Sequence, residues 1–185
     1  MKSIMEHIGE VKEKILRIIW ETENPVTTQE ISEKMGLKAR SANMHLLGLR
    51  KAGLTIMSGG GYVITAEGKE IIGFPKIDEE TAEKILSKIP QENAFYFYTG
   101  IDLPLGVSSD SLTDLCEKIR SIDVRTIEFH MARGDFESWI HHLGDIELEK
   151  RLGLIKELKL IGEALREKLY AALKSRCGEL LEIVS

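Results

Sequence analysis

Apolar residues near the start of the chain recur every three or four positions and are then interrupted by helix-breaking residues. The first such stripe consists of Ile4, Ile8, Val11, Ile15 and Ile18, with Lys and Glu between them. This spacing predicts an amphipathic helix that ends near Trp20. Asn24-Pro25 follows, and proline removes a backbone donor and disfavours helix at the residue before it. The first seventy residues are therefore expected to fold as several short elements.

A short second helix is predicted next. Thr27 or Thr28 supplies an N-cap oxygen, and Glu30 follows Thr27 at the spacing of a capping box. The helix runs to Met35, and Gly36 ends it with the left-handed conformation that a helix C-terminus favours.

A third helix and a hairpin complete this part of the chain. The third helix begins near Lys38, places Ala42, Leu46 and Leu49 on one face, and ends at Gly53. Residues 54–57 and 62–65 are short β-branched runs on either side of glycines, which predicts a hairpin. Residues 67–72 predict a brief closing helix.

Helix, short helix, turn, helix and hairpin is the order of elements in a winged helix-turn-helix. The residues that resemble this fold are 31–37, Ala42, His45-Leu46, Leu49, Ala52-Gly53-Leu54 and 62–68. The last of these segments is similar to the return strand and turn of MarR-like and ArsR-like regulators. The resemblance covers about 70 of the 185 residues. It implies a DNA-binding transcriptional regulator whose helix from about Lys38 to Ala52 reads the major groove.

The resemblance also places individual side chains. A helix fits the ~12 Å wide major groove, where Arg can pair with guanine, Asn can read adenine and an apolar side chain can touch the thymine methyl group. The residues expected to face the DNA are Lys38, Arg40, Ser41, Asn43 and Met44, and of these Arg40, Asn43 and Met44 are expected to contact bases. Arg50, Lys51 and Lys69 are expected to contact phosphate, which positions a protein on DNA without specifying sequence.

Two features favour an alternative, a winged helix that binds another protein and not DNA. Residues 55–66 of the expected wing contain no Lys or Arg, although DNA-binding wings often carry one. Leu47 is apolar where many relatives carry a polar or basic side chain. Winged helices also serve as protein-contact modules, so the fold alone does not decide between the two functions.

The second half of the chain predicts a mostly helical domain with one short aromatic strand. Residues 94–100 are the most aromatic stretch of the chain, and their composition favours a strand or a buried extended segment. Residues 103–106 and 108–111 are predicted to form a loop. Helical spacing marks residues 78–89 and 111–122, and further helices follow Asp123. Asp135 and Asp145 each come after a glycine, which favours a helix cap for both.

Segments of this half resemble a prokaryotic domain family of unknown function. The resemblance rests on residues 95–97, 127–130, 133–136, 139–140 and 143–145, and it spans about 94–155. It implies a fold family and no activity. If the domain holds a small-molecule effector, the expected lining is Tyr96, Tyr98, His130, Arg133 and Trp139; core packing is the alternative for the aromatic residues.

No motif indicates an enzyme, a cofactor or a metal site. HExxH and GxGxxG are absent. His141 and His142 are adjacent, so on a helix they point about 100° apart and do not easily share one ion. Cys116 and Cys177 match no metal-ligand spacing and are expected to be reduced thiols. We therefore expect no catalytic residues, no metal and no cofactor.

Charge divides the chain as the patterns do. Up to Gly73 the sequence has ten Lys/Arg and nine Asp/Glu, and from Phe74 onward fifteen and twenty-one, within a net charge of −5. We predict a mostly α protein with a small β component, formed by a winged helix-turn-helix over residues 1–73 and a helical domain over residues 74–185. A charged N-terminus and the lack of an apolar run of ~18 residues predict a cytoplasmic protein that does not enter the membrane.

The C-terminal region predicts one or two long helices. Their apolar stripe consists of Leu154, Leu158, Ile161, Leu165, Leu169 and Ala172, widened by Leu160 and Leu173. Such a stripe covers either its own domain or the same helix of a second chain. Because two recognition helices one DNA turn apart read a palindrome, we expect a homodimer.

Overall fold

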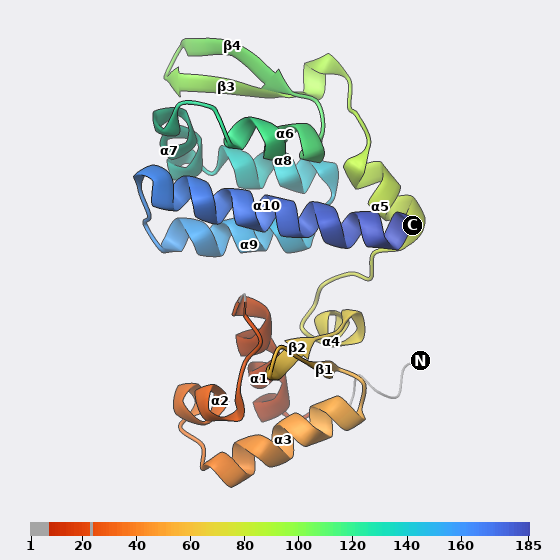
Figure 1. The fold of residues 1–185 in the computed structure, drawn as a ribbon. Coiled ribbons are helices and arrows are strands. Elements are labelled where there is room, and N and C mark those ends of the chain that lie inside the picture. Colours follow the sequence, from red (N-terminus) through yellow and green to blue (C-terminus); the bar gives the residue numbers. More distant parts are fainter. Residues whose placement is uncertain (1–7, 23) are drawn as a thin grey trace. The chain divides into compact units, whose positions relative to one another are not determined.

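The structure is a computed structural model that describes residues 8–22 and 24–185. It is mostly helical with a small β component, as the sequence predicts, and its strands form two small antiparallel hairpins (Figure 1). The chain divides into two compact units, Met1–Lys76 and Ile77–Ser185. The division lies three residues beyond the expected Gly73 because Phe74 is buried in the first unit, where its ring centroid is 4.6 Å from that of Trp20.

The first unit has the predicted order of elements. These are α1 (Glu10–Glu21), α2 (Thr28–Met35), α3 (Ala39–Lys51), β1 (Thr55–Ser58), β2 (Gly61–Ile64) and α4 (Ala66–Ile71). The predicted capping box is present, because Thr27 Oγ1 accepts from Glu30 N and the Glu30 carboxylate accepts from Thr27 N. Gly36 ends α2 with φ 63°. Helix α1 begins later than the apolar stripe predicts, and Ile4 lies outside the described residues.

Glycines allow the β1–β2 hairpin to form and to pack closely. Gly59 and Gly60 both have positive φ, as a tight two-residue hairpin turn requires. A Cβ on Gly61 would lie 2.7 Å from the carbonyl carbon of Pro25, so only glycine allows this approach. The approach lets Val26 and Tyr62 exchange backbone hydrogen bonds. The core beneath the hairpin includes Ile15, Leu16, Ile31, Leu46 and Leu49.

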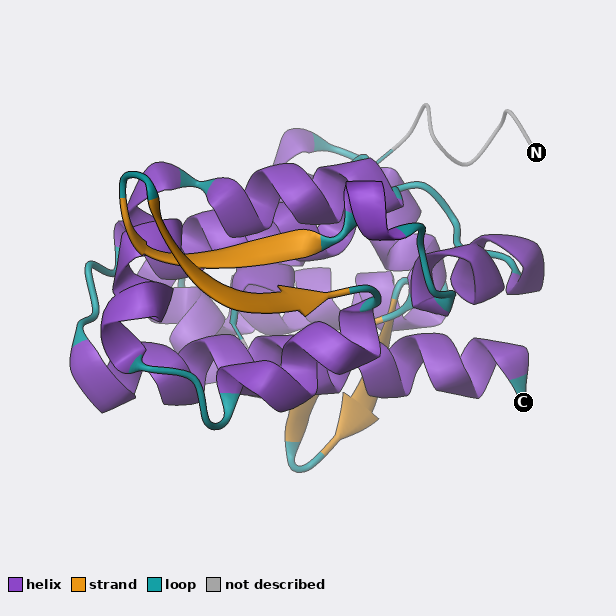
Figure 2. Cartoon of the chain, turned by 90° about the horizontal axis from the view of Figure 1, so that it is seen from above, coloured by secondary structure: helices purple, strands orange, loops and turns teal. Residues whose placement is uncertain are grey.

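The second unit is a helical domain with one hairpin on its surface. Its elements are α5 (Glu79–Leu86), the 3-10 helix η1 (Gln91–Asn93), β3 (Phe95–Gly100), β4 (Leu103–Ser109), α6 (Leu112–Ile119), α7 (Val124–Arg133), α8 (Asp135–Leu143), α9 (Ile146–Glu157) and α10 (Gly162–Val184). The β3–β4 hairpin lies across one face of the helices (Figures 1 and 2), and its inward residues Phe95 and Phe97 enter the core.

Two segments of the second unit differ from the prediction. Residues 103–109 form strand β4, although Pro104 and Gly106 suggested a loop. A two-stranded sheet leaves both strands as edges, where proline is tolerated, and the register shifts between Tyr96 and Gly100 absorb the irregularity. Helix α5 ends at Leu86 rather than at Ile89, because Ser87 already has an extended backbone.

Helix α10 packs against its own domain. Leu165, Leu169 and Leu173 are buried in the same core as residues of α5, α6 and α9. The predicted stripe is wrong at Leu158 and Ile161, which lie in the turn between α9 and α10 and are 56% and 76% exposed. In the described parts of the chain, residues 8–22 and 24–185, no helix combines the length and the apolar character needed to cross a bilayer.

Candidate functional site

Helix α3 presents one polar and cationic face away from its core. Ala42, Leu46 and Leu49 point into the first unit, and helical spacing therefore turns residues 40, 43, 44, 47 and 51 to the opposite side. The side chains of Lys38, Arg40, Asn43, Met44, Arg50 and Lys51 are exposed, and Ser41 and Lys69 are half-buried. Seven of the eight residues expected at a DNA interface belong to α3 or to its N-cap; Lys69 lies apart from them, on α4.

The electrostatics of this face favour an anionic partner. From Lys34 to Ala66 the chain has five Lys or Arg and no Asp or Glu. Within the described residues, the side chains of Lys38, Arg40 and Asn43 make no hydrogen bond or ion pair. No side chain caps the N-terminus of α3, so its first amide groups are also left for another partner.

Apolar side chains share the exposed surfaces of this unit. Met44 and Leu47 on α3 are 66% and 48% exposed, and Ile56 and Met57 on β1 are exposed as well. Gly48, which lies within α3, has only the Lys12 side chain of α1 near its missing Cβ, with Nζ 3.4 Å away. A close backbone approach therefore does not explain this glycine.

A second candidate site is a hollow of about 440 Å³ beside the β3–β4 hairpin. It is lined by all five residues that the sequence offered as a pocket: Tyr96, Tyr98, His130, Arg133 and Trp139. The further lining residues include Phe129, Asp135 and Asp102, which sequence reasoning did not offer for this site. The first two lie within four residues of Arg133, so their nearness in sequence was an available signal.

The aromatic walls of this hollow are held in fixed positions. The Trp139 indole Nε1 donates to the carbonyl of Asn93 at 3.0 Å. The Tyr96 hydroxyl donates to the carbonyl of Gln91 at 2.9 Å and accepts from the Gln91 side-chain amide. Phe95 lies with its ring nearly parallel to that of Phe136, 4.9 Å away. Hydrogen bonds and ring packing therefore fix the positions of Trp139, Tyr96 and Phe95.

His130 connects the strand to the two helices that line the hollow. Its Nε2 accepts from the backbone N–H of Tyr98 at 2.8 Å, so Nδ1 carries the proton and donates to the Asp135 carboxylate, also at 2.8 Å. Burial lowers the pKa of His130, although the contact with Asp135 acts in the opposite direction. The imidazole is therefore neutral, fully hydrogen-bonded and positioned as a structural link.

Asp135 does not cap α8, contrary to the prediction. The N-cap position is occupied by Gly134, and no side chain caps that helix. The Asp135 carboxylate instead accepts from His130 and from Arg133 Nε, the latter at 3.0 Å. The Arg133 guanidinium also lies over the ring of Phe129, 5.2 Å from its centroid. These contacts fix the arginine at the edge of the hollow.

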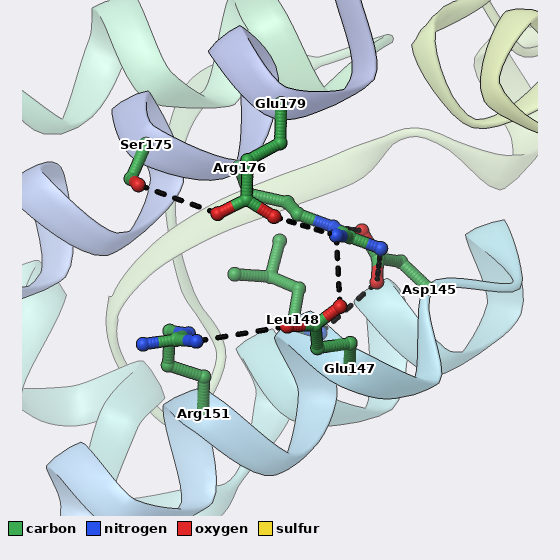
Figure 3. Close-up of polar contacts among 7 residues, drawn as sticks. All are labelled: Asp145, Glu147, Leu148, Arg151, Ser175, Arg176 and Glu179. Atoms are coloured by element: carbon green, nitrogen blue, oxygen red, sulfur yellow. Dashed lines mark hydrogen bonds and ion pairs between the residues drawn. The ribbon is translucent and has the colours of Figure 1, made fainter. Parts of the chain in front are cut away.

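A largely buried charged cluster, which does not line the hollow, joins α9 to α10 (Figure 3). Asp145 caps α9 as predicted, accepting from Leu148 N, but its carboxylate also receives a bidentate ion pair from Arg176. Arg176 further contacts Glu147 and Glu179, and all but Glu179 are buried. Asp145 and Arg176 are 31 positions apart in the sequence, so no local pattern indicates this pairing. Because every charged group of the cluster has a partner, we interpret the cluster as a structural contact that holds α10 against α9.

His141, His142 and the two cysteines are each in contact with neighbouring groups of the second unit. His141 Nδ1 contacts Glu149 and His142 Nδ1 contacts the carbonyl of Ser138. Cys116 and Cys177, distant in sequence, are both buried; their mutual contact raises the pKa of the Cys177 thiol, as does its burial. Over residues 8–22 and 24–185, no group of three His, Cys, Asp or Glu side chains is arranged to hold a metal ion.

One comparison with known proteins bears on the first unit. Residues 2–58 match the family model described as FaeA-like protein, which spans the segment through α1, α2, α3 and β1. The match covers less than half of the chain and therefore characterises this segment and not the whole protein. No curated protein and no solved structure matches the chain.

Proposed function

We propose that this protein is a DNA-binding transcriptional regulator that reads the major groove with helix α3. The observation that carries the proposal is the exposed face of α3, where Lys38, Arg40 and Asn43 are unengaged by any described residue. The match of residues 2–58 to the FaeA-like family supports it, because that family resembles regulators of the helix-turn-helix type. The likeness to MarR-like and ArsR-like regulators belongs to the same proposal.

Each side chain has a distinct role in this proposal. Arg40 and Asn43 are the specificity residues, since their side chains can each make paired hydrogen bonds to a base edge. Lys38, Ser41 and the free amide groups of the α3 N-terminus bind backbone phosphate near the groove. Arg50, Lys51 and Lys69 add further phosphate contacts, and Met44 contacts a thymine methyl group.

A homodimer completes the proposal. One α3 helix contacts only a few base pairs, and two copies related by a two-fold axis read two half-sites about 34 Å apart. Because α10 packs largely on its own domain, the dimer contact must involve another surface or the exposed apolar residues that α10 retains, Leu181 and Ile183. Sedimentation of the purified chain with and without its DNA site measures the stoichiometry.

Selection from random-sequence DNA by the full chain, repeated at several salt concentrations, tests the proposal. We expect one enriched motif, with affinity that falls steeply as salt rises because each neutralised phosphate releases a counterion. Enrichment of no motif, together with no retardation of duplex DNA even at low salt, would contradict it.

The second candidate function is a protein-interaction module. Met44, Leu47, Ile56 and Met57 favour it, because exposed apolar side chains suit a protein partner better than a phosphate backbone. It predicts that replacing Met44 and Leu47 by Ser abolishes partner binding and that Arg40→Ala has little effect. The DNA proposal predicts the reverse order of effects on DNA binding, so comparing the double variant with Arg40→Ala distinguishes the two functions.

A further inference from the structure

The hollow beside the β3–β4 hairpin contains the features of a small-molecule site. Its volume of about 440 Å³ lies within the range of ligand pockets. Phe95, Tyr96, Tyr98, Phe129 and Trp139 supply aromatic lining. Because the hydroxyl of Tyr96 and the indole nitrogen of Trp139 are already hydrogen-bonded within the protein, these two side chains can offer a ligand mainly their ring surfaces.

Two of the polar groups left unsatisfied in the hollow can donate hydrogen bonds. Arg133 uses Nε for Asp135, and its two terminal nitrogens have no hydrogen-bond partner among the described residues. The Tyr98 hydroxyl is also without a partner in that part of the chain. His130 is not available, because both of its ring nitrogens are engaged. A planar guanidinium with two free N–H₂ groups matches a carboxylate, which it binds with two parallel hydrogen bonds.

Arg133 determines the charge of the expected ligand more than the two carboxylates of the hollow do. Asp135 already accepts hydrogen bonds from Arg133 Nε and from His130, so its carboxylate is satisfied within the protein. Asp102 is exposed in the β3–β4 turn and, within the described residues, no side-chain contact holds it in place. Arg133 is held by both Asp135 and the Phe129 ring, and a group fixed before binding loses less entropy on binding.

We propose that this hollow binds a small aromatic carboxylate, with its ring against Tyr96, Tyr98 and Trp139 and its carboxylate on the terminal nitrogens of Arg133. The Tyr98 hydroxyl supplies a further donor to the same anion. The ligand leaves the His130 link intact, since it needs neither imidazole nitrogen. The inference does not depend on DNA binding, and its test contains no DNA.

Calorimetric titration of the full chain with matched probes tests the aromatic and the anionic requirement separately. The aromatic carboxylates are benzoate, 1-naphthoate and indole-3-acetate. Benzamide lacks the charge, cyclohexanecarboxylate lacks the aromatic ring, and benzamidine reverses the charge. We expect at least one aromatic carboxylate to bind with a Kd in the micromolar to millimolar range, and the three control probes to bind at least about tenfold more weakly.

Variants locate the binding. Arg133→Gln should weaken binding of the aromatic carboxylate by about tenfold or more, since hydrogen bonds to a charged group are lost. Arg133→Lys should weaken binding less, because lysine keeps the positive charge but lacks the two terminal N–H₂ groups of the guanidinium. Arg120→Gln is the matched control: Arg120 also pairs with a nearby carboxylate, Glu117, and lies over an aromatic ring, Tyr170, but does not line the hollow. It should leave binding unchanged.

Three results would overturn the inference. One is binding of none of the aromatic carboxylates by a chain whose thermal melt shows it folded. Another is stronger binding of benzamidine than of benzoate, weakened by Asp102→Asn, which would make this a cation site. The third is equal loss of binding in Arg133→Gln and Arg120→Gln, which would place the ligand elsewhere or show a general effect of charge.

Discussion

At the scale of single residues, the side chains of Asp135 and Asp145 make contacts that the sequence does not predict. Asp135 follows a glycine, which is the local pattern of a helix cap, yet its carboxylate serves His130 and Arg133. Asp145 has the same local pattern and does cap its helix, but Arg176 comes to it across 31 residues. Local spacing predicted the cap at Asp145 and was wrong at Asp135, and it says little about which distant charge a carboxylate will meet.

The His130 link makes the second unit sensitive to acid. The folded-state pKa of His130 is lowered, so between the unfolded-state value of about 6.5 and the lower folded-state value the unfolded chain binds more protons. The contribution of His130 to the free energy of unfolding is therefore fully present above about pH 6.5. It falls as the pH drops through that window, with a slope of at most about 1.4 kcal/mol per pH unit.

Urea unfolding of wild type and of His130→Gln between about pH 7.5 and pH 5 measures this dependence. We expect His130→Gln to be less stable at the upper end of this range and to show a flatter profile. Asp135 and Arg133, which face the imidazole, and Glu137, whose pKa is raised by burial, are present in both chains. Parallel profiles for the two proteins would show that His130 does not titrate in this way.

The buried ion cluster predicts a second stability effect. Arg176→Met should destabilise the second unit by about 3–5 kcal/mol, because Asp145 then remains buried as an uncompensated charge and the buried Glu147 loses one of its cationic partners. The triple variant Arg176→Met, Asp145→Asn, Glu147→Gln should recover part of the loss, since the side-chain oxygen of the introduced asparagine can still cap α9. Denaturant midpoints measure both. A triple variant that is less stable than the single one would contradict this interpretation.

At the scale of elements, glycines and caps made the first unit predictable. The capping box at Thr27, the turn at Gly36 and the glycines of the hairpin are local signals, and each element appears where they place it. Strand β4 was not predictable in this way. Its Pro104 and Gly106 indicate a loop when read alone, and the segment becomes a strand only because β3 pairs with it.

Two glycine substitutions in the first unit should have opposite effects. A Cβ on Gly68 would lie 2.2 Å from the carbonyl oxygen of Leu54, so Gly68→Ala should destabilise the fold by about 1–3 kcal/mol or more. Gly48→Ala meets only the flexible Lys12 side chain and should stabilise α3 by up to about 1 kcal/mol. Thermal melts of both variants test the packing of α4 on β1 and β2. Equal stability of the two would show that this packing is wrong.

At the scale of the whole molecule, each unit has its own core and its own candidate site, and the two sites differ in kind. The first unit offers an exposed helix face with unpaired cations, and its helical periodicity alone was enough to locate that face. The second offers a concave site, and the sequence suggested its five aromatic and polar residues only as a conditional set. What periodicity could not supply was the hollow itself, because its walls come from β3, α7 and α8, which pack together only in the folded chain.

The central claim is that α3 reads bases with Arg40 and binds phosphate with Lys51. Competition binding of the full chain to its selected site and to random DNA measures both. We expect Arg40→Ala to lose about 1–3 kcal/mol of binding free energy on the selected site only. Lys51→Ala should weaken binding to both DNAs alike and reduce the slope of log affinity against log salt by about 1. Arg17→Ala, which removes a surface cation of α1, is the control and should change neither. Equal effects of Arg40→Ala and Arg17→Ala on both DNAs would contradict the account.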